Sequence, residues 1–276
     1  MKRSDIVVGA DLAGRTLAEA LDAIDDGRGA VEEGRVFLDG KRAENPAQTL
    51  ALGARIVVHG ARARVHRDLI VLFEDADIIV LDKSPGDHLN ETETNAQPAL
   101  VERIPGAHVV HRLDRDTSGV VVLAKNAIAA AELSAAFRDR KVQKTYLAIV
   151  EGSIPDGELT NPIGVDPRRP RARKVRSDGQ TAHTTITTLG REHCLSAIRA
   201  VPHTGRTHQI RVHLAHHGAP ILGDRTYGGP MVVRVGEEIV QVGRTMLHAR
   251  RLSLPGWAEF SAPVPDDMRR FGLPLE

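Results

Sequence analysis

Hydrophobic positions near the start of the chain repeat with a helical period. Leu17, Leu21 and Ile24 are spaced by four and three residues, so they share one face of an amphipathic helix predicted within residues 12–24. The pattern then changes to short strands, because apolar triplets are separated by an Asp-Gly turn at residues 39–40 and by polar residues. The elements predicted after the helix are one further helical turn over 29–33 and strands at 36–38, 41–42 and 56–58.

From about residue 69 onward the chain consists mostly of short apolar or alternating runs, which predict strands. The predicted strands cover residues 69–73, 78–82, 120–124, 145–150, 181–189 and 194–201, a hairpin over 232–242, and one or two strands within 247–260. The predicted helices cover residues 97–104, about 127–140, and 208–217. Because strands and helices do not alternate regularly, the sequence predicts an α+β fold with a mixed or antiparallel sheet.

Two of these helices carry start signals. Asn126 is a suitable N-cap for the helix that runs to about residue 140, in which Ile128, Leu133 and Phe137 are expected to point inward. Thr207 is predicted to be the N-cap of the helix over 208–217, because its hydroxyl can accept a hydrogen bond from the first turn.

Composition narrows the class of protein without selecting a function. The 276 residues are 41% hydrophobic and 26% charged, which is ordinary for a soluble globular protein. The net charge is only +1, so binding to nucleic acid would have to rest on local patches. A single cysteine, Cys194, excludes an intrachain disulfide and suits a reducing compartment. With no apolar run long enough for a signal peptide or a membrane span, we expect a cytoplasmic protein without membrane contact.

One local patch is strongly basic. Six cations occur within nine positions: Arg168, Arg169, Arg171, Arg173, Lys174 and Arg176. Prolines at 167 and 170 interrupt the run, which is typical of a solvated loop. Beside a site that handles a polyanion, the same loop would instead be an arm that contacts phosphates.

The chemistry concentrates between two apolar runs, one ending at Val110 and one over 120–124. The stretch between them, residues 111–119, reads His-Arg-Leu-Asp-Arg-Asp-Thr-Ser-Gly. Asp114 stands two residues after Arg112 and directly before Arg115, and cations that close could keep its carboxylate ionised. In the alternative interpretation, the two aspartates only cap a turn and the arginines face water.

Several further stretches share their residues and their order with one family. They are Lys144-Thr145-Tyr146, residues 204–213 (Thr-Gly-Arg-Thr-His-Gln-Ile-Arg-Val-His), residues 220–224 (Pro-Ile-Leu-Gly-Asp), His248-Ala249 and residues 263–265 (Pro-Val-Pro). Together with the Asp114 stretch, they resemble the RluA family of pseudouridine synthases from about residue 69 to the end. The chain departs at Lys83-Ser84-Pro85-Gly86, where the family usually has Lys-Pro-x-Gly.

The beginning of the chain resembles a second family, the S4 RNA-binding domain. Glu32-Glu33-Gly34-Arg35-Val36 and Asp39-Gly40-Lys41 match its signature, whereas residues 25–29 replace most of its second helix. We therefore expect a small S4-like α+β domain over residues 1–66 and a pseudouridine synthase domain over 67–276. The resemblance implies a mixed, largely antiparallel sheet flanked by helices in the larger domain. The alternative for residues 1–66 is a packing domain without a ligand.

The resemblance also implies a reaction. These enzymes isomerise uridine in RNA, in that the N1–C1′ bond breaks, the uracil turns, and C5 bonds to C1′, which requires neither a metal nor a redox cofactor. Asp114 is the implied nucleophile, through attack on C1′ or C6 or through an elimination. Arg211 is its implied salt-bridge partner, and Tyr146 would stack on the base and take the C5 proton. Tyr227 is interpreted as structural.

The expected partner is RNA, more specifically ribosomal rather than transfer RNA, and the protein is expected to be a monomer without an obligate protein partner. Flipping a uridine costs a few kcal/mol, and least in loops, so a structured loop or bulge is the expected target. Arg112 is the candidate wedge that fills the gap in the stack. The predicted RNA-contacting residues are Arg112, Arg115, Lys144, Arg168, Arg169, Arg171, Arg173, Lys174, Arg206 and His208.

A metal hydrolase is one alternative, because histidines concentrate around the predicted helix over 208–217. They are His203, His208, His213, His216 and His217. His213 and His217 are one helical turn apart, as in zinc-binding helices, but no Glu follows His213 as in His-Glu-x-x-His. Histidines in the last turn of a helix also interact favourably with its dipole, which needs no metal.

Two further alternatives keep the central motif. Asp114 and Asp116 could be the paired carboxylates of a glycosidase, which lie about 5–5.5 Å apart in retaining enzymes. The flanking arginines argue against this, because they favour ionised carboxylates whereas one partner has to stay protonated. A non-catalytic RNA-binding protein of the same fold would lose nothing measurable on replacement of Asp114 by Asn.

Overall fold

The computed structural model describes residues 3–22, 30–31, 36–43, 45–59, 68–89 and 99–276. These form two compact units, residues 1–68 with 90–99, and residues 69–89 with 100–276. Most of the predicted helical turn over 29–33, most of the Glu-Glu-Gly-Arg-Val stretch and the predicted boundary at residue 66 lie outside the described residues. In the described part of the chain, no helix combines the length and the apolar character needed to cross a membrane.

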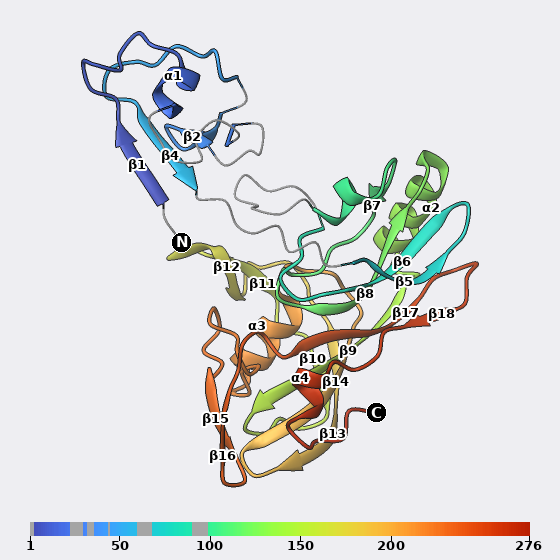
Figure 1. Ribbon diagram of the computed structural model, residues 1–276. Helices are drawn as coiled ribbons and strands as arrows, with labels where there is room; N and C mark the ends of the chain where they lie inside the picture. The colour runs from blue at the N-terminus through green and yellow to red at the C-terminus, as the bar shows by residue number, and fades with distance from the viewer. Residues whose placement is uncertain (1–2, 23–29, 32–35, 44, 60–67, 90–98) are drawn as a thin grey trace. The chain divides into compact units, whose positions relative to one another are not determined.

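The N-terminal unit contains a four-stranded antiparallel sheet in the order β1-β4-β2-β3 (Figure 1). Its elements are β1 (Arg3–Val7), α1 (Leu17–Leu21), β2 (Val36–Leu38), β3 (Lys41–Arg42) and β4 (Arg55–His59). The hairpin at Asp39-Gly40 is confirmed, and both residues have positive φ, as its turn type requires. The helix starts later than predicted, because Thr16 and Glu19 form a capping box. Strand β1 was not predicted.

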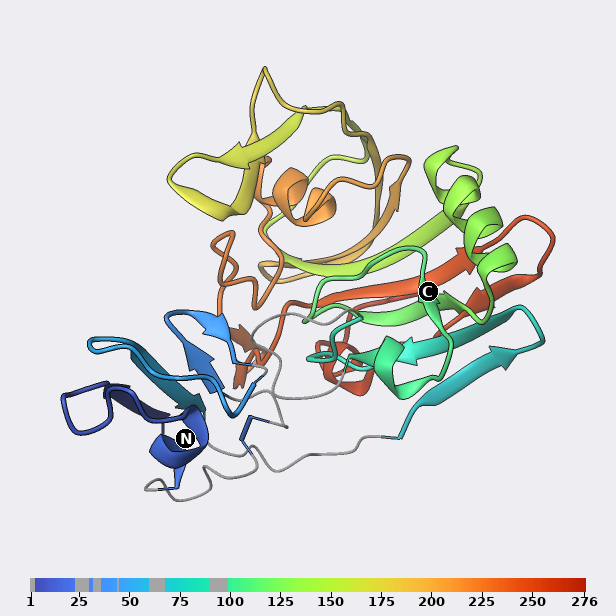
Figure 2. The same ribbon diagram turned by 90° about the horizontal axis from the view of Figure 1, so that it is seen from above.

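The larger unit is organised on a ten-stranded sheet, which confirms the predicted mixed, largely antiparallel architecture (Figures 1 and 2). The central order is β10-β13-β14-β9-β17-β8-β6-β5, with β18 beside β17 and β7 beside β8. The bounds are β5 (Ile70–Glu74), β6 (Ile78–Lys83), β7 (His108–Val109), β8 (Ser118–Ala124), β9 (Gln143–Glu151), β10 (Gly157–Leu159), β13 (Thr184–Glu192), β14 (Leu195–Pro202), β17 (Leu247–Ser253) and β18 (Glu259–Ser261). Strand β8 pairs in parallel with β17 and antiparallel with β6.

Smaller elements complete this unit. A 3₁₀ turn over Leu100–Arg103 lies within the predicted helix over 97–104, of which residues 97–98 are not described. Strands β15 (Val232–Val235) and β16 (Glu238–Gln241) form the predicted hairpin around residues 236–237. A short helix, α4 (Asp266–Arg269), was not predicted.

Helix α2 (Ala127–Arg138) begins as predicted, because the side chain of Asn126 accepts a hydrogen bond from the backbone of Ala129. Leu133 is buried, and Phe137 packs at the edge of the core. The prediction for Ile128 is wrong, since its side chain is 75% exposed. The buried face runs through Ala129 and Leu133, and Ile128 is turned about 100° away from Ala129 on a helix of 3.6 residues per turn.

Helix α3 (Gln209–His216) begins one residue later than predicted, with His208 rather than Thr207 at the N-cap position. His208 takes a left-handed backbone conformation (φ +59°). The side chain of Gln209, turned inward, accepts hydrogen bonds from the Thr204 hydroxyl and the Arg206 backbone. The loop before α3 is thus held by Gln209 instead of by a threonine cap.

The basic run is a strand and not the predicted loop. Strand β11 (Ile163–Asp166) pairs antiparallel with β12 (Arg169–Val175), and we call this pair the arginine hairpin. Ala172 is buried and the neighbouring Arg171 is exposed, because successive side chains of a strand point to opposite faces. Helix α3 lies between the arginine hairpin and strands β13 and β14 (Figure 2).

At Gly119 the backbone of β8 lies directly against the backbone of β17. Gly119 has φ +109°, and a Cβ at this position would overlap the carbonyl group of Ala249 on β17. We predict that Gly119→Ala lowers the free energy of unfolding by about 3 kcal/mol, because the methyl group adds both overlap and backbone strain. Chemical denaturation measures this change. Ile128→Ala is the control, expected within about 0.5 kcal/mol of the parent because the side chain is exposed. Equal stability of the two variants would contradict the packing described here.

Candidate active site

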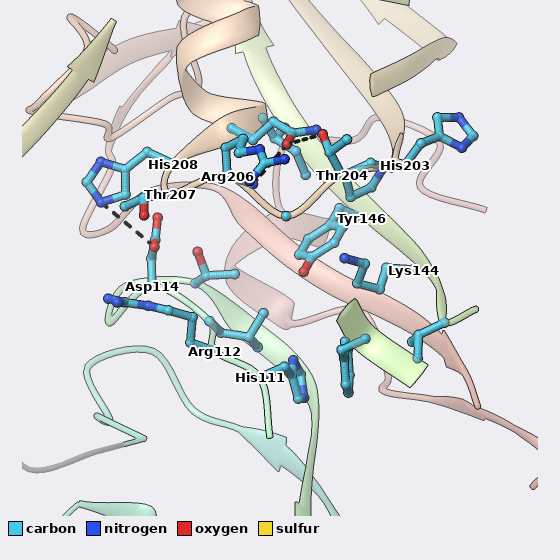
Figure 3. Close-up of a pocket in the computed structure, with 18 of the residues that line it drawn as sticks. His111, Arg112, Asp114, Lys144, Tyr146, His203, Thr204, Arg206, Thr207 and His208 are labelled. Carbon is cyan, nitrogen blue, oxygen red and sulfur yellow. Dashed lines mark hydrogen bonds and ion pairs between the residues drawn. The ribbon is translucent and has the colours of Figure 1, made fainter. Parts of the chain in front are cut away.

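A cleft of about 400 Å³ opens in the larger unit, where segments distant in the sequence meet (Figure 3). The segment between β7 and β8 contributes Arg112 and Asp114, strand β9 contributes Lys144 and Tyr146, and the loop before α3 contributes His208. The end of α2 and the loop that follows it line a further part of the wall. The structure therefore brings three of the stretches that carried the sequence resemblance, those around Asp114, Tyr146 and His208, to one space.

The centre of the site is an arginine held between two aspartates. Nη1 of Arg211 donates to Oδ2 of Asp114 at 2.7 Å, which confirms the expected ion pair. Its other edge binds Asp224 in a bidentate manner, through Nε at 2.7 Å and Nη2 at 2.8 Å. Burial alone would lower the pKa of Arg211, but the hydrogen bonds and charge of Asp224, with the charge of Asp114, raise it. The guanidinium thus stays charged and fixed in orientation.

Asp224 is the member of this triad to which sequence analysis assigned no role. Its side chain is 1% exposed, and its Oδ1 also accepts the backbone N–H groups of Thr226 and Tyr227. No room exists for a Cβ at Gly223 or Gly229, so the chain folds tightly around the carboxylate. A signal was present in the sequence, because an acid after the apolar run at 220–223 needs a buried cation.

The Asp114 turn is anchored from behind by a buried lysine. Lys83 is 1% exposed, and its Nζ donates to the carbonyl oxygens of Ser84 at 2.9 Å and Arg115 at 2.8 Å. The backbone N–H of Gly86 donates to the same Arg115 oxygen. Burial lowers the pKa of Lys83 to about 8, although neighbouring carboxylates favour its charge. The residue that follows Asp114 is therefore held by two donors.

Two histidines stabilise the flanks of the same turn. Nε2 of His111 accepts the backbone N–H of Val122, and its ring stacks on Phe137 with centroids 4.5 Å apart. Burial lowers the pKa of His111 to about 3, so it is neutral. On the other flank, Ser118 is hydrogen-bonded to Nδ1 of the buried His248 at 2.9 Å. These contacts tie both ends of the turn to the sheet.

Tyr146 borders the cleft from β9 (Figure 3). Burial, and after it the negative charge of Asp114, raise the pKa of its phenol. The ring therefore stays protonated at neutral pH and offers the cleft a flat, uncharged surface. A nucleobase can stack on such a ring at a cost of little side-chain entropy.

With this geometry in place, comparison with known proteins is decisive. The family model for RNA pseudouridylate synthase matches residues 70–216, which is more than half of the 276 residues. The chain belongs to the RNA pseudouridylate synthase family. As an RNA pseudouridine synthase it is an isomerase, and the sequence prediction of this activity is confirmed.

Individual relatives agree with this assignment. The synthase is 36% identical over 270 residues to ribosomal large subunit pseudouridine synthase D of Xanthomonas campestris, covering 87% of this chain and 81% of that one. It is 34% identical to the protein of the same name in Vibrio cholerae, with 88% and 84% covered. Among solved structures, human RNA pseudouridylate synthase domain containing 1 aligns with a TM-score of 0.58 and 30% identity over 71% of this chain and 83% of that one. The family match begins at residue 70, so residues 1–69 lie outside it.

The ten predicted RNA-contacting residues separate into four that line the cleft, Arg115 at the surface, and five in the arginine hairpin. Four line the cleft, namely Arg112, Lys144, Arg206 and His208. Arg206 is held by the carbonyl oxygen of Thr181 and the side chain of Gln180. Arg115 is not among the lining residues, and its guanidinium pairs with Asp116 at 3.0 Å on the surface. Arg211, and not the neighbouring arginines, provides the ion pair with Asp114.

The other five residues belong to the arginine hairpin. They are Arg168, Arg169, Arg171, Arg173 and Lys174. Arg169 pairs with Asp166 and donates to the carbonyl of Thr226, whereas the guanidinium of Arg173 donates to backbone carbonyls of its own strand. The side chains of Arg168, Arg171 and Lys174 are exposed. None of the five lines the cleft.

The clustered histidines form hydrogen bonds and ring contacts with other residues of the protein. His213 is buried between the hydroxyl of Thr184 and the carbonyl of Asn161, and His217 binds the side chain of Asn161. The His203 ring stacks on that of His183, with centroids 4.3 Å apart. Within the described residues, no three metal-ligating side chains come together.

The buried lysine makes stability depend on pH. Below about pH 8 Lys83 is charged in the folded and in the unfolded protein, so the folded protein bears the full free-energy cost of burying that charge. Between pH 8 and 10.5 the unfolded chain binds the extra proton, so the folded state gains stability as the pH rises. We predict that across this range the free energy of unfolding of wild type rises by up to about 3 kcal/mol relative to that of Lys83→Met. Urea unfolding at pH 7, 8.5 and 10 gives the free energy of unfolding of both proteins. If this free energy changes with pH equally in wild type and Lys83→Met, the prediction is contradicted.

Proposed function

We propose that this synthase isomerises a specific uridine in structured ribosomal RNA of the large subunit, with Asp114 as the catalytic carboxylate. The observation that carries the proposal is the ion pair of Asp114 with Arg211 in a cleft that Tyr146 also borders. The choice of RNA is supported by the names of several relatives, which are ribosomal large subunit pseudouridine synthases. A transfer RNA substrate is the alternative.

The carboxylate of Asp114 would act in its ionised form. Attack on C1′, attack on C6 and elimination all begin with an electron pair on a carboxylate oxygen, and Arg211 stabilises the negative charge that supplies it. The carboxylate side chain is 20% exposed, so it remains accessible from the cleft. Asp224 pairs with Arg211 from the buried side. Asp114 is therefore the carboxylate of this pair whose oxygen a substrate can reach.

The detached uracil would stay on the ring of Tyr146 while it turns. A raised pKa keeps this phenol protonated, and stacking is therefore the role that its environment favours over proton abstraction. Arg112, exposed at the cleft, would fill the space in the RNA stack that the flipped uridine leaves. A loop or bulge is the expected target, because unpaired bases cost the least to extrude.

Two regions outside the cleft would add affinity for RNA. The exposed cations of the arginine hairpin can bind phosphates without reading sequence. The N-terminal unit, over the predicted residues 1–66, would be the S4-like RNA-binding domain. Its Asp-Gly-Lys hairpin, with β2 and β3, supports this interpretation.

The decisive variant is Asp114→Asn, which keeps the shape of the side chain but loses the charge. We predict at least a thousandfold loss of tritium release from large-subunit ribosomal RNA that carries [5-³H]uridine, with RNA affinity within about threefold of wild type. Asp116→Asn is the matched control and should retain activity, because the ion pair of Asp116 is with Arg115 at the surface and not with Arg211. An Asp114→Asn enzyme with normal turnover would leave a binding protein as the remaining interpretation.

A second variant tests the arginine hairpin. Replacing Arg168, Arg171 and Lys174 by Gln should reduce the slope of log Kd against log salt by about 2, since each phosphate contact releases counterions. The control replaces three arginines that do not line the cleft, Arg199, Arg234 and Arg251. RNA titrations between 50 and 300 mM KCl give the slopes. A slope that changes equally in both triple variants would reflect net charge and not the hairpin.

A further inference from the structure

The hydroxyl of Tyr227 connects the arginine hairpin to the site. It lies 2.9 Å from the backbone nitrogen of Arg173 on β12 and 2.7 Å from Nδ1 of His208. The same ring lies against Arg211, whose guanidinium carbon is 5.0 Å from the ring centre. Sequence analysis interpreted Tyr227 as structural, but it contacts two groups that surround Asp114.

The directions of these hydrogen bonds follow from what each group can donate. A backbone N–H is a donor, so the Tyr227 oxygen accepts from Arg173, and the hydroxyl proton needs an acceptor of its own. Among the described residues, Nδ1 of His208 is the acceptor within reach. Burial lowers the pKa of His208 although the charge of Asp114 opposes this, so the ring is neutral and carries one proton. With Nδ1 accepting, that proton is on Nε2.

Nε2 of His208 faces the oxygen of Asp114 that Arg211 leaves open. It lies 3.8 Å from Oδ1, whereas Oδ2 is engaged by Arg211 at 2.7 Å (Figure 3). A distance of 3.8 Å is too long for a hydrogen bond, so Oδ1 keeps its lone pairs available. An N–H at this place attracts Oδ1, but the other tautomer would turn a nitrogen lone pair toward it and repel it.

We propose that Tyr227 is a positioning residue that holds His208 in the Nε2–H tautomer, and that this N–H orients Oδ1 of Asp114 as the reacting oxygen. The inference rests on the proposed function of Asp114. It assigns different tasks to the two carboxylate oxygens, since Oδ2 anchors the side chain and Oδ1 reacts. As Oδ1 regains its charge late in the reaction, the N–H stabilises that charge.

The backbone at His208 fits this role. A left-handed conformation is uncommon for residues other than Gly, although Asn, Asp and His adopt it more often than the rest, and surrounding contacts hold His208 in it. Here it directs the imidazole between Tyr227 and Asp114, at the point where α3 begins. The strain is thus located at the side chain that would contact the reacting group.

Two substitutions separate the parts of this arrangement. Tyr227→Phe removes the hydroxyl and keeps the ring against Arg211. His208→Asn suits the left-handed backbone, and its amide oxygen can still accept from Tyr227, but it removes the Nε2–H. We expect each to lower kcat about tenfold on [5-³H]uridine-labelled large-subunit ribosomal RNA, with KM changed less than twofold. Because they act on one N–H, the double variant should lose no more than either single one.

Nitrogen-15 NMR of the imidazoles in the free enzyme gives a second readout that does not require turnover. The His208 signal, identified by its loss in His208→Asn, should show a protonated Nε2 and an unprotonated Nδ1 in wild type, and a mixture in Tyr227→Phe. Circular dichroism melting confirms that each variant is folded before it is compared.

Specific outcomes would overturn the inference. An Nδ1–H tautomer in wild type, an unchanged His208 spectrum in Tyr227→Phe, or losses that multiply in the double variant would each do so. If wild type releases no tritium from this RNA, the proposed substrate fails. The tautomer, measured without RNA, then decides the positioning role of Tyr227 on its own.

Discussion

The guanidinium of Arg211 is the point on which the site depends, because it satisfies two carboxylates that could not otherwise lie so close together. Asp224 is deeply buried, where a carboxylate is costly unless a cation lies beside it, whereas Asp114 has to remain accessible. A planar fork with donors on two edges can serve both, and a lysine ammonium could not reproduce this geometry. Breaking a buried pair of this kind typically costs about 3–5 kcal/mol, so the charge arrangement is also part of the fold.

The sheet makes this arrangement rigid from three directions. Lys83 holds the turn after Asp114 from the end of β6, and Ser118 and His248 join β8 to β17 beside it. Helix α3 presents Arg211 from the opposite wall, fixed by Asp224 in a turn without room for side chains at its glycines. Asp114 is therefore on a loop, but Lys83, His248 and Arg211, which hold that loop, belong to β6, β17 and α3.

The sequence predicted correctly those elements that depend on interactions between residues close together in the chain. The Asp-Gly hairpin, the Asn126 cap and the strands β13 and β14 depend on short-range chemistry and on period-two patterns, and all are present. The identity of Asp224 as the second partner of Arg211 depends on tertiary folding, as do the strand conformation of the arginine run and the exposure of Ile128. No spacing along the chain reports which of several aspartates will meet an arginine across the cleft.

The last sixty residues have a consequence for how the enzyme can be divided. The family model matches the chain as far as residue 216, yet Asp224, Tyr227 and His248 all come after it. A fragment cut at that border would carry the acid and Arg211 but would lack the buried anion that orients the guanidinium. It would also lack β17, the strand between β8 and β9. The partner that orients Arg211 and the strand that joins β8 to β9 are therefore both supplied by residues beyond 216.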